Sequence, residues 1–301
     1  MTLKTEQLHA LASTLDVATI DVATDALVSN QVDAARCVLA CRDVIRAGAS
    51  AMAKTLRNGG TLYYVAAGSS GLMVAADAME LGGTFGIPVA QIEILMAGGV
   101  PTTAHMPGDV EDEVDKLPVL LANVSDRDCL IAVTASGSTP YTLRAAELAR
   151  AGGATVIGIA NNSQALLFET SDHAIALDTP SEVLSGSTRM GAGTAQKIAL
   201  NTLSTLMGVE LGHVYQGLMV NLKADNLKLL ARARGIVRQV TQVDEATAAS
   251  ALTRSGGDVK IACLLALGAQ SPELARAALI RSQGHLGPAI ARLHSHDTIP
   301  K

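Results

Sequence analysis

Aromatic residues are scarce in this sequence: of its 301 residues none is tryptophan, two are phenylalanine and four are tyrosine. Nucleotide bases therefore have almost no side chains on which to stack, and a formal net charge of -5 leaves no basic stripe for a phosphate backbone. We accordingly expect no nucleic-acid partner. Because hydrophobic residues still make up 49% of the chain, we expect a globular protein with an aliphatic core.

Long apolar runs are also missing. Polar residues interrupt every stretch of about 18 residues, so no membrane-spanning helix is expected. The segment Met1–Glu6 lacks the apolar centre of a signal peptide, which predicts a cytoplasmic protein. Cysteine is limited to Cys37, Cys41, Cys129 and Cys263. Cys37 and Cys41 would share a helix face, but nothing supplies the remaining ligands of a zinc site, so we expect reduced, mostly buried thiols and no metal.

Five short, almost wholly apolar segments have the composition of buried β-strands: residues 61–67, 91–96, 129–134, 155–160 and 173–177. Helical patterns of apolar residues alternate with them. Strands without a polar side are typical of a parallel sheet that helices cover on both faces. The sequence therefore predicts an α/β fold with a doubly wound, parallel, five-stranded sheet, followed by a helical C-terminal part.

Apolar residues recur at helical spacing in the segments between and after these strands. This predicts helices at residues 30–58, 71–81 and 140–151, then two long ones at 188–211 and 221–241. Three short helices are expected at 244–254, 258–268 and 272–282. We therefore divide the chain into residues 1–241, with the sheet, the N-terminal helices and helices for dimerisation, and a small three-helix appendage at 242–301.

Two strand ends open into loops rich in glycine and hydroxyl side chains. Loop 1 is Gly68-Ser69-Ser70-Gly71, and loop 2 is Ser136-Gly137-Ser138-Thr139-Pro140. Ligands of open parallel sheets bind beyond the carboxyl ends of the strands, where helices begin. Glycine lets backbone amides approach an anion and the hydroxyls add donors, so the two loops predict a phosphate site that needs no lysine. Capped turns without a ligand are the alternative, since serine and threonine also favour helix caps.

Longer motifs resemble a known family. The loop motifs are Ala67-Gly-Ser-Ser-Gly71, Ala135-Ser-Gly-Ser-Thr-Pro-Tyr141 and Glu182-Val-Leu-Ser-Gly-Ser-Thr-Arg-Met190, the last followed by Ala192-Gly-Thr-Ala-Gln-Lys197. Further matching segments are Asp77-Ala-Met-Glu80, Thr84-Phe-Gly86 and Gly256-Gly-Asp-Val-Lys260. On these motifs the chain resembles, over nearly its whole length, the N-acetylmuramic acid 6-phosphate etherases of the sugar-isomerase (SIS) superfamily.

The resemblance implies an SIS-type fold, a homodimer, a phosphorylated amino sugar as ligand and no cofactor. The family's reaction removes D-lactate from the C3 ether of N-acetylmuramic acid 6-phosphate. Water then adds to the unsaturated intermediate and leaves N-acetylglucosamine 6-phosphate. One carboxylate takes the C2 proton of the open-chain aldehyde, and a second carboxylic acid protonates the departing ether oxygen. A carbon–oxygen lyase of amino-sugar metabolism is therefore expected.

By the same resemblance, Glu80 matches the family's acid and Glu111 its base. The third motif adds substrate-binding residues to those of loops 1 and 2, namely Ser187, Thr188 and Arg189. The bare sequence leaves alternatives open for the two glutamates. Glu80 could be a surface residue near a helix end, and Glu111 lies in an acidic run, residues 109–115, that the first turn of a helix would favour electrostatically. His105, in the preceding loop, is another candidate base.

Three departures from the family's motifs each remove a cation. Leu72, Ser138 and Gly191 stand where the family usually has two arginines and a lysine. Because arginine recognises a carboxylate through paired hydrogen bonds, these departures predict poorer recognition of the lactyl group. Two other functions therefore stay open beside the etherase: a phosphosugar-binding regulator or sensor without turnover, and an aldose–ketose phosphosugar isomerase.

Overall fold

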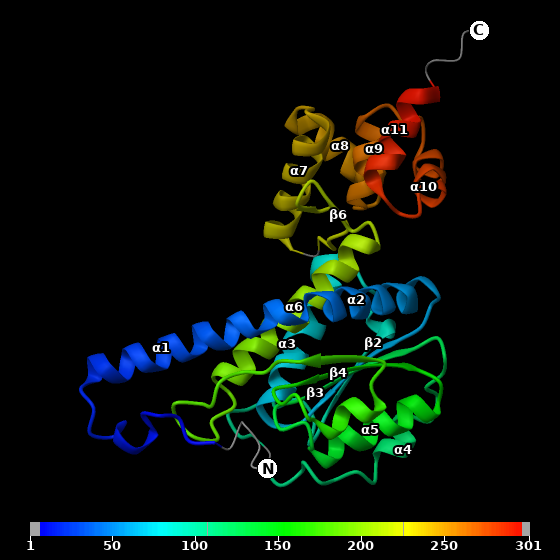
Figure 1. The fold of residues 1–301 in the computed structure, drawn as a ribbon. Coiled ribbons are helices and arrows are strands. Elements are labelled where there is room, and N and C mark those ends of the chain that lie inside the picture. Colours follow the sequence, from blue (N-terminus) through cyan, green and yellow to red (C-terminus); the bar gives the residue numbers. More distant parts are fainter. Residues whose placement is uncertain (1–6, 107, 225, 297–301) are drawn as a thin grey trace. The chain divides into compact units, whose positions relative to one another are not determined.

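The computed structural model describes residues 7–106, 108–224 and 226–296. The segment Met1–Glu6, in which the sequence predicts no signal peptide, lies outside them. Contacts divide the chain into two compact units (Figure 1). The first, which we call the α/β unit, runs to Ala78 and resumes from Val89 to Leu206. The second, the helical unit, comprises Met79–Pro88 and the chain from Met207 onward. The domain boundary predicted after residue 241 stays a prediction.

Five strands form the sheet of the α/β unit within the described residues: β1 (Leu62–Ala66), β2 (Ile92–Met96), β3 (Cys129–Thr134), β4 (Thr155–Ala160) and β5 (His173–Ala176). Their bounds fall within one residue of the predicted segments. Neighbouring strands all pair in parallel, in the order β2-β1-β3-β4-β5. The predicted doubly wound parallel sheet is confirmed. Its strand order reverses between β1 and β3, which is where such sheets bind ligands.

Helices lie against both faces of this sheet (Figure 1). The α/β unit contains α1 (Ile20–Cys37), α2 (Arg42–Arg57), α4 (Leu117–Leu120), α5 (Pro140–Ala151) and the beginnings of α3 (Gly68–Phe85) and α6 (Gly191–Glu210), with short 3-10 turns η2 (Ala12–Thr14), η3 (Val38–Cys41), η4 (Val89–Gln91) and η5 (Leu166–Thr170). α4 and α5 share one aliphatic cluster with Val65 and Leu130 of the sheet. On the opposite face Tyr64 bonds to Asp77 of α3. Side chains of one strand thus alternate between two helical layers.

The single helix predicted for residues 30–58 is interrupted. α1 begins earlier, because Thr19 caps its first turn, and ends at Cys37. The turn η3 follows, and α2 begins at Arg42. The thiol of Cys41 donates to the carbonyl of Ala176 at the end of β5, which ties the break to the sheet. All four cysteines are reduced thiols, and three of them are buried, as the sequence predicts.

The helical unit contains a short hairpin and a set of helices: β6 (Val214–Tyr215), β7 (Leu218–Met219), α7 (Leu227–Thr241), α8 (Glu245–Arg254), α9 (Val259–Ala266), α10 (Pro272–Arg281) and α11 (Leu286–His296). The three short helices predicted after residue 242 are present, and α11 is an addition. The helix predicted from residue 221 begins only at Leu227, since Asn226 caps it. No helix among the described residues combines the length and apolarity needed to cross a membrane.

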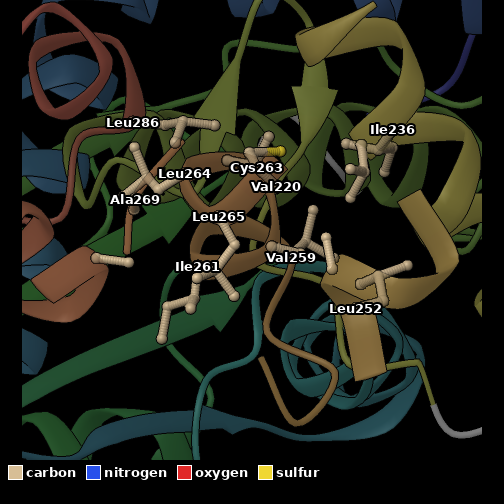
Figure 2. Close-up of a cluster of buried hydrophobic side chains, with 14 of the residues drawn as sticks. Val220, Ile236, Leu252, Val259, Ile261, Cys263, Leu264, Leu265, Ala269 and Leu286 are labelled. Carbon is tan, nitrogen blue, oxygen red and sulfur yellow. The ribbon is translucent and has the colours of Figure 1, made fainter. Parts of the chain in front are cut away.

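The core of the helical unit gathers around α9, and Figure 2 shows its side chains. Ile261, Leu264 and Leu265 of α9 pack in one cluster with Ile236 of α7 and Leu286 of α11. Lys260 is the exception on this helix. Its side chain is 5% exposed and donates to the carbonyls of Gly212 (3.1 Å) and Gly284 (3.0 Å). Burial lowers the pKa of Lys260 to about 8.

Candidate active site

Loops 1 and 2 leave neighbouring strands at the same edge of the sheet. β1 pairs with β3 along its length, with Ala66 opposite Val133 just before the two loops. The strand order reverses between these two strands. In doubly wound folds the crossover connections then leave on opposite faces and open a crevice between the strand ends. The two loops therefore border the place where a ligand of this fold is expected.

Loop 1 is helical, whereas the sequence predicts a turn. α3 begins at Gly68, whose φ of +54° belongs to the left-handed region that favours glycine. Ser69 is half-buried and Ser70 is buried. A Cβ at Gly71 would lie 2.7 Å from Met96 of β2, so glycine lets the helix pack closely there. The hydroxyls and the first amides of α3 thus lie at the carboxyl end of β1, an arrangement that favours an anion.

Loop 2 is held by hydrogen bonds among its own hydroxyl groups. Thr139 stands at the N-cap position of α5, with Pro140 in the first helical position as the sequence predicts. Its hydroxyl makes no cap bond but pairs with Thr134 over 2.7 Å. Ser136 Oγ accepts from both the amide and the hydroxyl of Ser138, each at 3.2 Å. Loop 2 therefore presents its donors in a fixed arrangement.

Gly137 shapes the backbone of loop 2. Its φ is +79°, and a Cβ at this position would collide with Ala165. Its carbonyl accepts from the amide of Leu167 over 3.1 Å, which joins the loop to the segment after β4. A side chain at position 137 would therefore strain the backbone and displace a neighbour.

Glu111 lies beside both loops. A Cβ on Gly68 would stand 2.8 Å from Glu111 Oε1, so the carboxylate approaches the start of α3 where glycine leaves room. The carbonyl of Glu111 accepts from the amide of Tyr141, in the first turn of α5, over 3.0 Å. The acidic run 109–115 forms turns, and the next helix, α4, begins only at Leu117. A role in a helix's first turn is therefore excluded for Glu111. His105 is exposed in the preceding loop.

The two predicted catalytic glutamates fall in different compact units. Glu80 lies on α3 and is exposed, but its contacts assign it to the helical unit, whereas Glu111 belongs to the α/β unit. The assignment of Glu80 as the acid stays a prediction.

The third motif, residues 182–190, forms a loop whose two ends are joined by hydrogen bonds to the side chain of Glu182. This side chain is 2% exposed and accepts from the amides of Gly191 (3.0 Å) and Ala192 (2.8 Å), at the start of α6. The carboxylate thereby satisfies amides that a helix start leaves unpaired. The loop between carries the predicted binding residues: Ser187 and Thr188 are half-buried and Arg189 is exposed. Sequence reasoning gave Glu182 no role.

A buried amide network links loop 2 to the start of α6. The amide of Asn161 donates to the carbonyl of Ala135 (3.1 Å), and its side chain donates to the carbonyl of Ala192 (3.3 Å). Gln196 of α6 donates to Asn161 Oδ1 over 2.8 Å. Sequence reasoning also missed this pair. The available signal was a polar residue directly after a buried strand, which needs partners in an aliphatic core.

The three departures from the family's motifs occupy different surroundings. Leu72 is 41% exposed on α3, and Ser138 is half-buried in loop 2. Gly191 is buried: a Cβ there would lie 3.1 Å from Glu182 and 3.2 Å from Asn30 and Ala34. A side chain at position 191 would therefore require these neighbours to shift by a few tenths of an ångström, whereas a side chain at position 72 reaches solvent.

The described part of the chain contains no group of three His, Cys, Asp or Glu side chains arranged to hold a metal ion. Its chemistry lies in donors at two adjacent strand ends and in one carboxylate beside them. Such a set can bind a phosphate ester and move a proton at a neighbouring carbon.

Comparisons with known proteins agree with this geometry. A model of the SIS domain matches residues 34–161, which include loops 1 and 2. An N-acetylmuramic acid 6-phosphate etherase of Deinococcus radiodurans is 43% identical over 272 residues, 89% of each chain. Another from Pseudoalteromonas atlantica is 37% identical over 298 residues, covering 95% of this chain and 96% of the relative. The resemblance seen in the motifs is thereby confirmed, and the chain belongs to the N-acetylmuramic acid 6-phosphate etherase family of SIS-domain proteins.

Proposed function

We propose that this protein is a carbon–oxygen lyase that cleaves the C3 ether of N-acetylmuramic acid 6-phosphate and releases D-lactate. Relatives that carry this name match the chain over most of its length. The observation that carries the proposal is the position of Glu111, whose carboxylate lies against Gly68 and whose backbone meets the start of α5. A carboxylate at the switch point, beside two loops suited to a phosphate, has the chemistry that the elimination requires.

The phosphate is assigned to loops 1 and 2. Ser69 and Ser70 offer hydroxyls beside the first amides of α3, and Ser136, Ser138 and Thr139 offer them at the end of β3. Charge-assisted hydrogen bonds to a phosphate of this kind contribute roughly 1.5–3 kcal/mol each. Ser187, Thr188 and Arg189 of the third motif complete the proposed ligand set, to which Arg189 adds a cation.

The proposed reaction begins from the open-chain aldehyde, which acidifies the proton on C2. Glu111 takes this proton to give an enolate, the C3–O bond then breaks, and Glu80 protonates the departing oxygen, so that D-lactate leaves intact. Water then adds across the C2–C3 double bond, with hydroxide bonding to C3 and a proton to C2. The sum is hydrolysis of the ether to D-lactate and N-acetylglucosamine 6-phosphate, and it needs no oxidant or cofactor.

We further propose that the protein is a cytoplasmic homodimer. A phosphorylated sugar suits the cytoplasm, and α1 offers an apolar face for self-association: Val28 and Val32, one turn apart, are 57% and 44% exposed. The sequence suggested the helices after residue 188 for this role. Sedimentation should show a dimer at micromolar concentration, and Val28→Glu should shift it toward the monomer.

The test of the function is a coupled assay of both products. Wild-type protein given N-acetylmuramic acid 6-phosphate should release D-lactate and N-acetylglucosamine 6-phosphate in equal amounts. Glu111→Gln should lower kcat/KM by about 10²–10⁴-fold, the usual contribution of a general base. Asp112→Asn removes an exposed carboxylate from the same turn and should keep the wild-type rate.

The alternatives predict different outcomes of this assay. A sensor binds the phosphosugar and releases no lactate. An isomerase interconverts aldose and ketose phosphates and leaves the ether intact. Either result from folded protein that binds the phosphosugar would overturn the lyase proposal, and equal rates for Glu111→Gln and wild type would remove Glu111 from the base role.

A further inference from the structure

A buried carboxylate joins three elements of the α/β unit. Asp77 of α3 is 3% exposed. Its Oδ1 accepts from the side-chain amide of Asn201 (2.6 Å) and from the hydroxyl of Ser204 (2.8 Å), both on α6. Its Oδ2 accepts from the hydroxyl of Tyr64 on β1 over 3.0 Å. One side chain thereby fixes α3 against the sheet and against α6.

Burying the Asp77 carboxylate costs free energy, which its hydrogen bonds must offset. A buried ionised carboxylate loses hydration, and neutral donors replace it here. Burial, together with the charge of Asp77, raises the pKa of Tyr64 well above its usual value, so the phenol remains a donor. Around Asp77 the buried residues of α3 are aliphatic, as at Val74, Ala78 and Leu81. An aliphatic side chain would serve packing alone, and what the carboxylate adds is direction: its bonds specify the rotation and axial position of α3.

The three joined elements are those that carry parts of the proposed site. β1 leads into loop 1, and α3 begins with Ser69 and Ser70. α6 begins directly after the loop that carries Ser187, Thr188 and Arg189. Rotating a helix by one residue moves its side chains by about 100° and shifts them about 1.5 Å along the axis. The bonds of Asp77 therefore bear on the placement of loop 1 and the third loop. Loop 2, on β3 and α5, is held by hydrogen bonds of its own and by the main chain of Asn161 after β4, so its geometry does not depend on α6 alone.

We propose that Asp77 is a positioning residue for the phosphosugar site, acting through α3 and α6 without touching the substrate. The proposal rests on the proposed function, since it takes Ser69 and Ser70 to be phosphate ligands. The proposal predicts different responses of the two loops. Loss of the Asp77 hydrogen bonds should disturb loop 1 and leave loop 2 in place.

Double-mutant cycles on kcat/KM for N-acetylmuramic acid 6-phosphate test this distinction. Asp77→Asn keeps the shape of the side chain but turns an amide donor toward one of its donors. We expect it to lower kcat/KM by about 10²-fold, because misplacing a site by about 1 Å has effects of that size. Ser70→Ala should then cost much less in the Asp77→Asn background than in wild type. Ser138→Ala, in loop 2, should cost the same in both backgrounds.

Two further variants serve as controls. Ser204→Ala removes one donor from α6 and keeps the carboxylate, and it should give a smaller loss with the same coupling to Ser70→Ala, even where Asp77→Asn fails to fold. Thr142→Val is a matched core control, since its buried hydroxyl has no hydrogen-bond partner among the described residues, and it should leave kcat/KM unchanged. If the effect of Asp77→Asn is additive with those of both Ser70→Ala and Ser138→Ala, the positioning role is wrong and the proposed function is unaffected. A wild type that neither binds nor cleaves the substrate overturns the proposed function, and the positioning role with it.

Discussion

The two units bury polar side chains in different places and to different effect. In the α/β unit, Asp77, Glu182 and Asn161 bond to helix starts or neighbouring elements beside the loops of the candidate site. In the helical unit, the aliphatic cluster around α9 surrounds Lys260, which bonds to two main-chain carbonyls of that same unit. In the α/β unit, buried polar side chains hold the helices and strands from which the site loops emerge. In the helical unit, the buried lysine joins segments of that unit's core.

This contrast separates two kinds of substitution. Changes in the polar network of the α/β unit should affect ligand binding and turnover beyond their effect on folding. Changes in the core of the helical unit should affect stability and leave ligand binding close to wild type. Substitutions of the site residues themselves give the first test of this separation.

The largest losses of activity are expected on substitution of the two proposed catalytic carboxyls. Their roles in C2 exchange and in lactate release should be separable. In heavy water Glu111→Gln should stop both exchange at C2 and release of lactate, because the C2 proton is no longer taken. Glu80→Gln should abolish elimination and still permit some C2 exchange. Each loss should reach about 10²–10⁴-fold. Proton NMR of the recovered sugar and a lactate assay measure the two steps, and full elimination by either variant would show that its assignment is wrong.

Glycine-to-alanine substitutions should change the free energy of unfolding in opposite directions in the two units. Gly137→Ala places a side chain at a φ of +79° and against Ala165, so the free energy of unfolding should fall by about 1–3 kcal/mol and turnover should drop. Gly235 lies exposed within α7, with no atom within 4 Å of an added Cβ. Gly235→Ala should raise the free energy of unfolding by about 0.5–1 kcal/mol and keep turnover. Urea unfolding followed by circular dichroism measures both, and equal effects would remove the contrast.

Lys260 should give stability a pH dependence without changing ligand binding. Its pKa is about 8 in the folded chain against 10.5 for an ordinary lysine, so between these values the unfolded chain binds more protons. The free energy of unfolding from this group therefore rises with pH, by about 1 kcal/mol from pH 8 to pH 9. Lys260→Met should lose that rise and bind phosphosugar as wild type does at pH 7. Parallel pH profiles for the two proteins would contradict the assignment.

A further prediction concerns specificity at Leu72. Leu72→Arg introduces a guanidinium on the exposed side of α3, and it should raise kcat/KM for the lactyl substrate by about tenfold, equivalent to about 1.4 kcal/mol. Ala76→Arg, one turn along the same helix and also exposed, is the matched control and should gain nothing. An equal gain in both variants would indicate general attraction of an anion, and no gain in either would remove Leu72 from specificity.

The sheet could be predicted closely because buried parallel strands are short, apolar and bounded by glycine and polar turns. Interruptions of helices were harder to predict. Val38–Cys41 contains neither proline nor glycine to mark the break between α1 and α2. α11 was not predicted, although Pro288 falls in its first turn, where a helix tolerates it.

The loops of the site could also be predicted, since glycine and hydroxyl residues directly follow buried strands. The partners of their supporting residues could not. Asp77 bonds to Asn201 and Ser204, and Glu182 to the amides that begin α6, and spacing along the chain indicates none of these pairs. Burial of a polar group demands a partner, but only the fold decides which one.

Solvent isotope incorporation tests elimination followed by hydration most directly. Wild-type protein should convert N-acetylmuramic acid 6-phosphate in water enriched in oxygen-18 to N-acetylglucosamine 6-phosphate that carries the label on C3. The D-lactate should contain no label, because the ether oxygen leaves with it. In heavy water, one deuterium should appear at C2 of the sugar. Label in the lactate, or retention of the C2 proton through turnover, would contradict the mechanism.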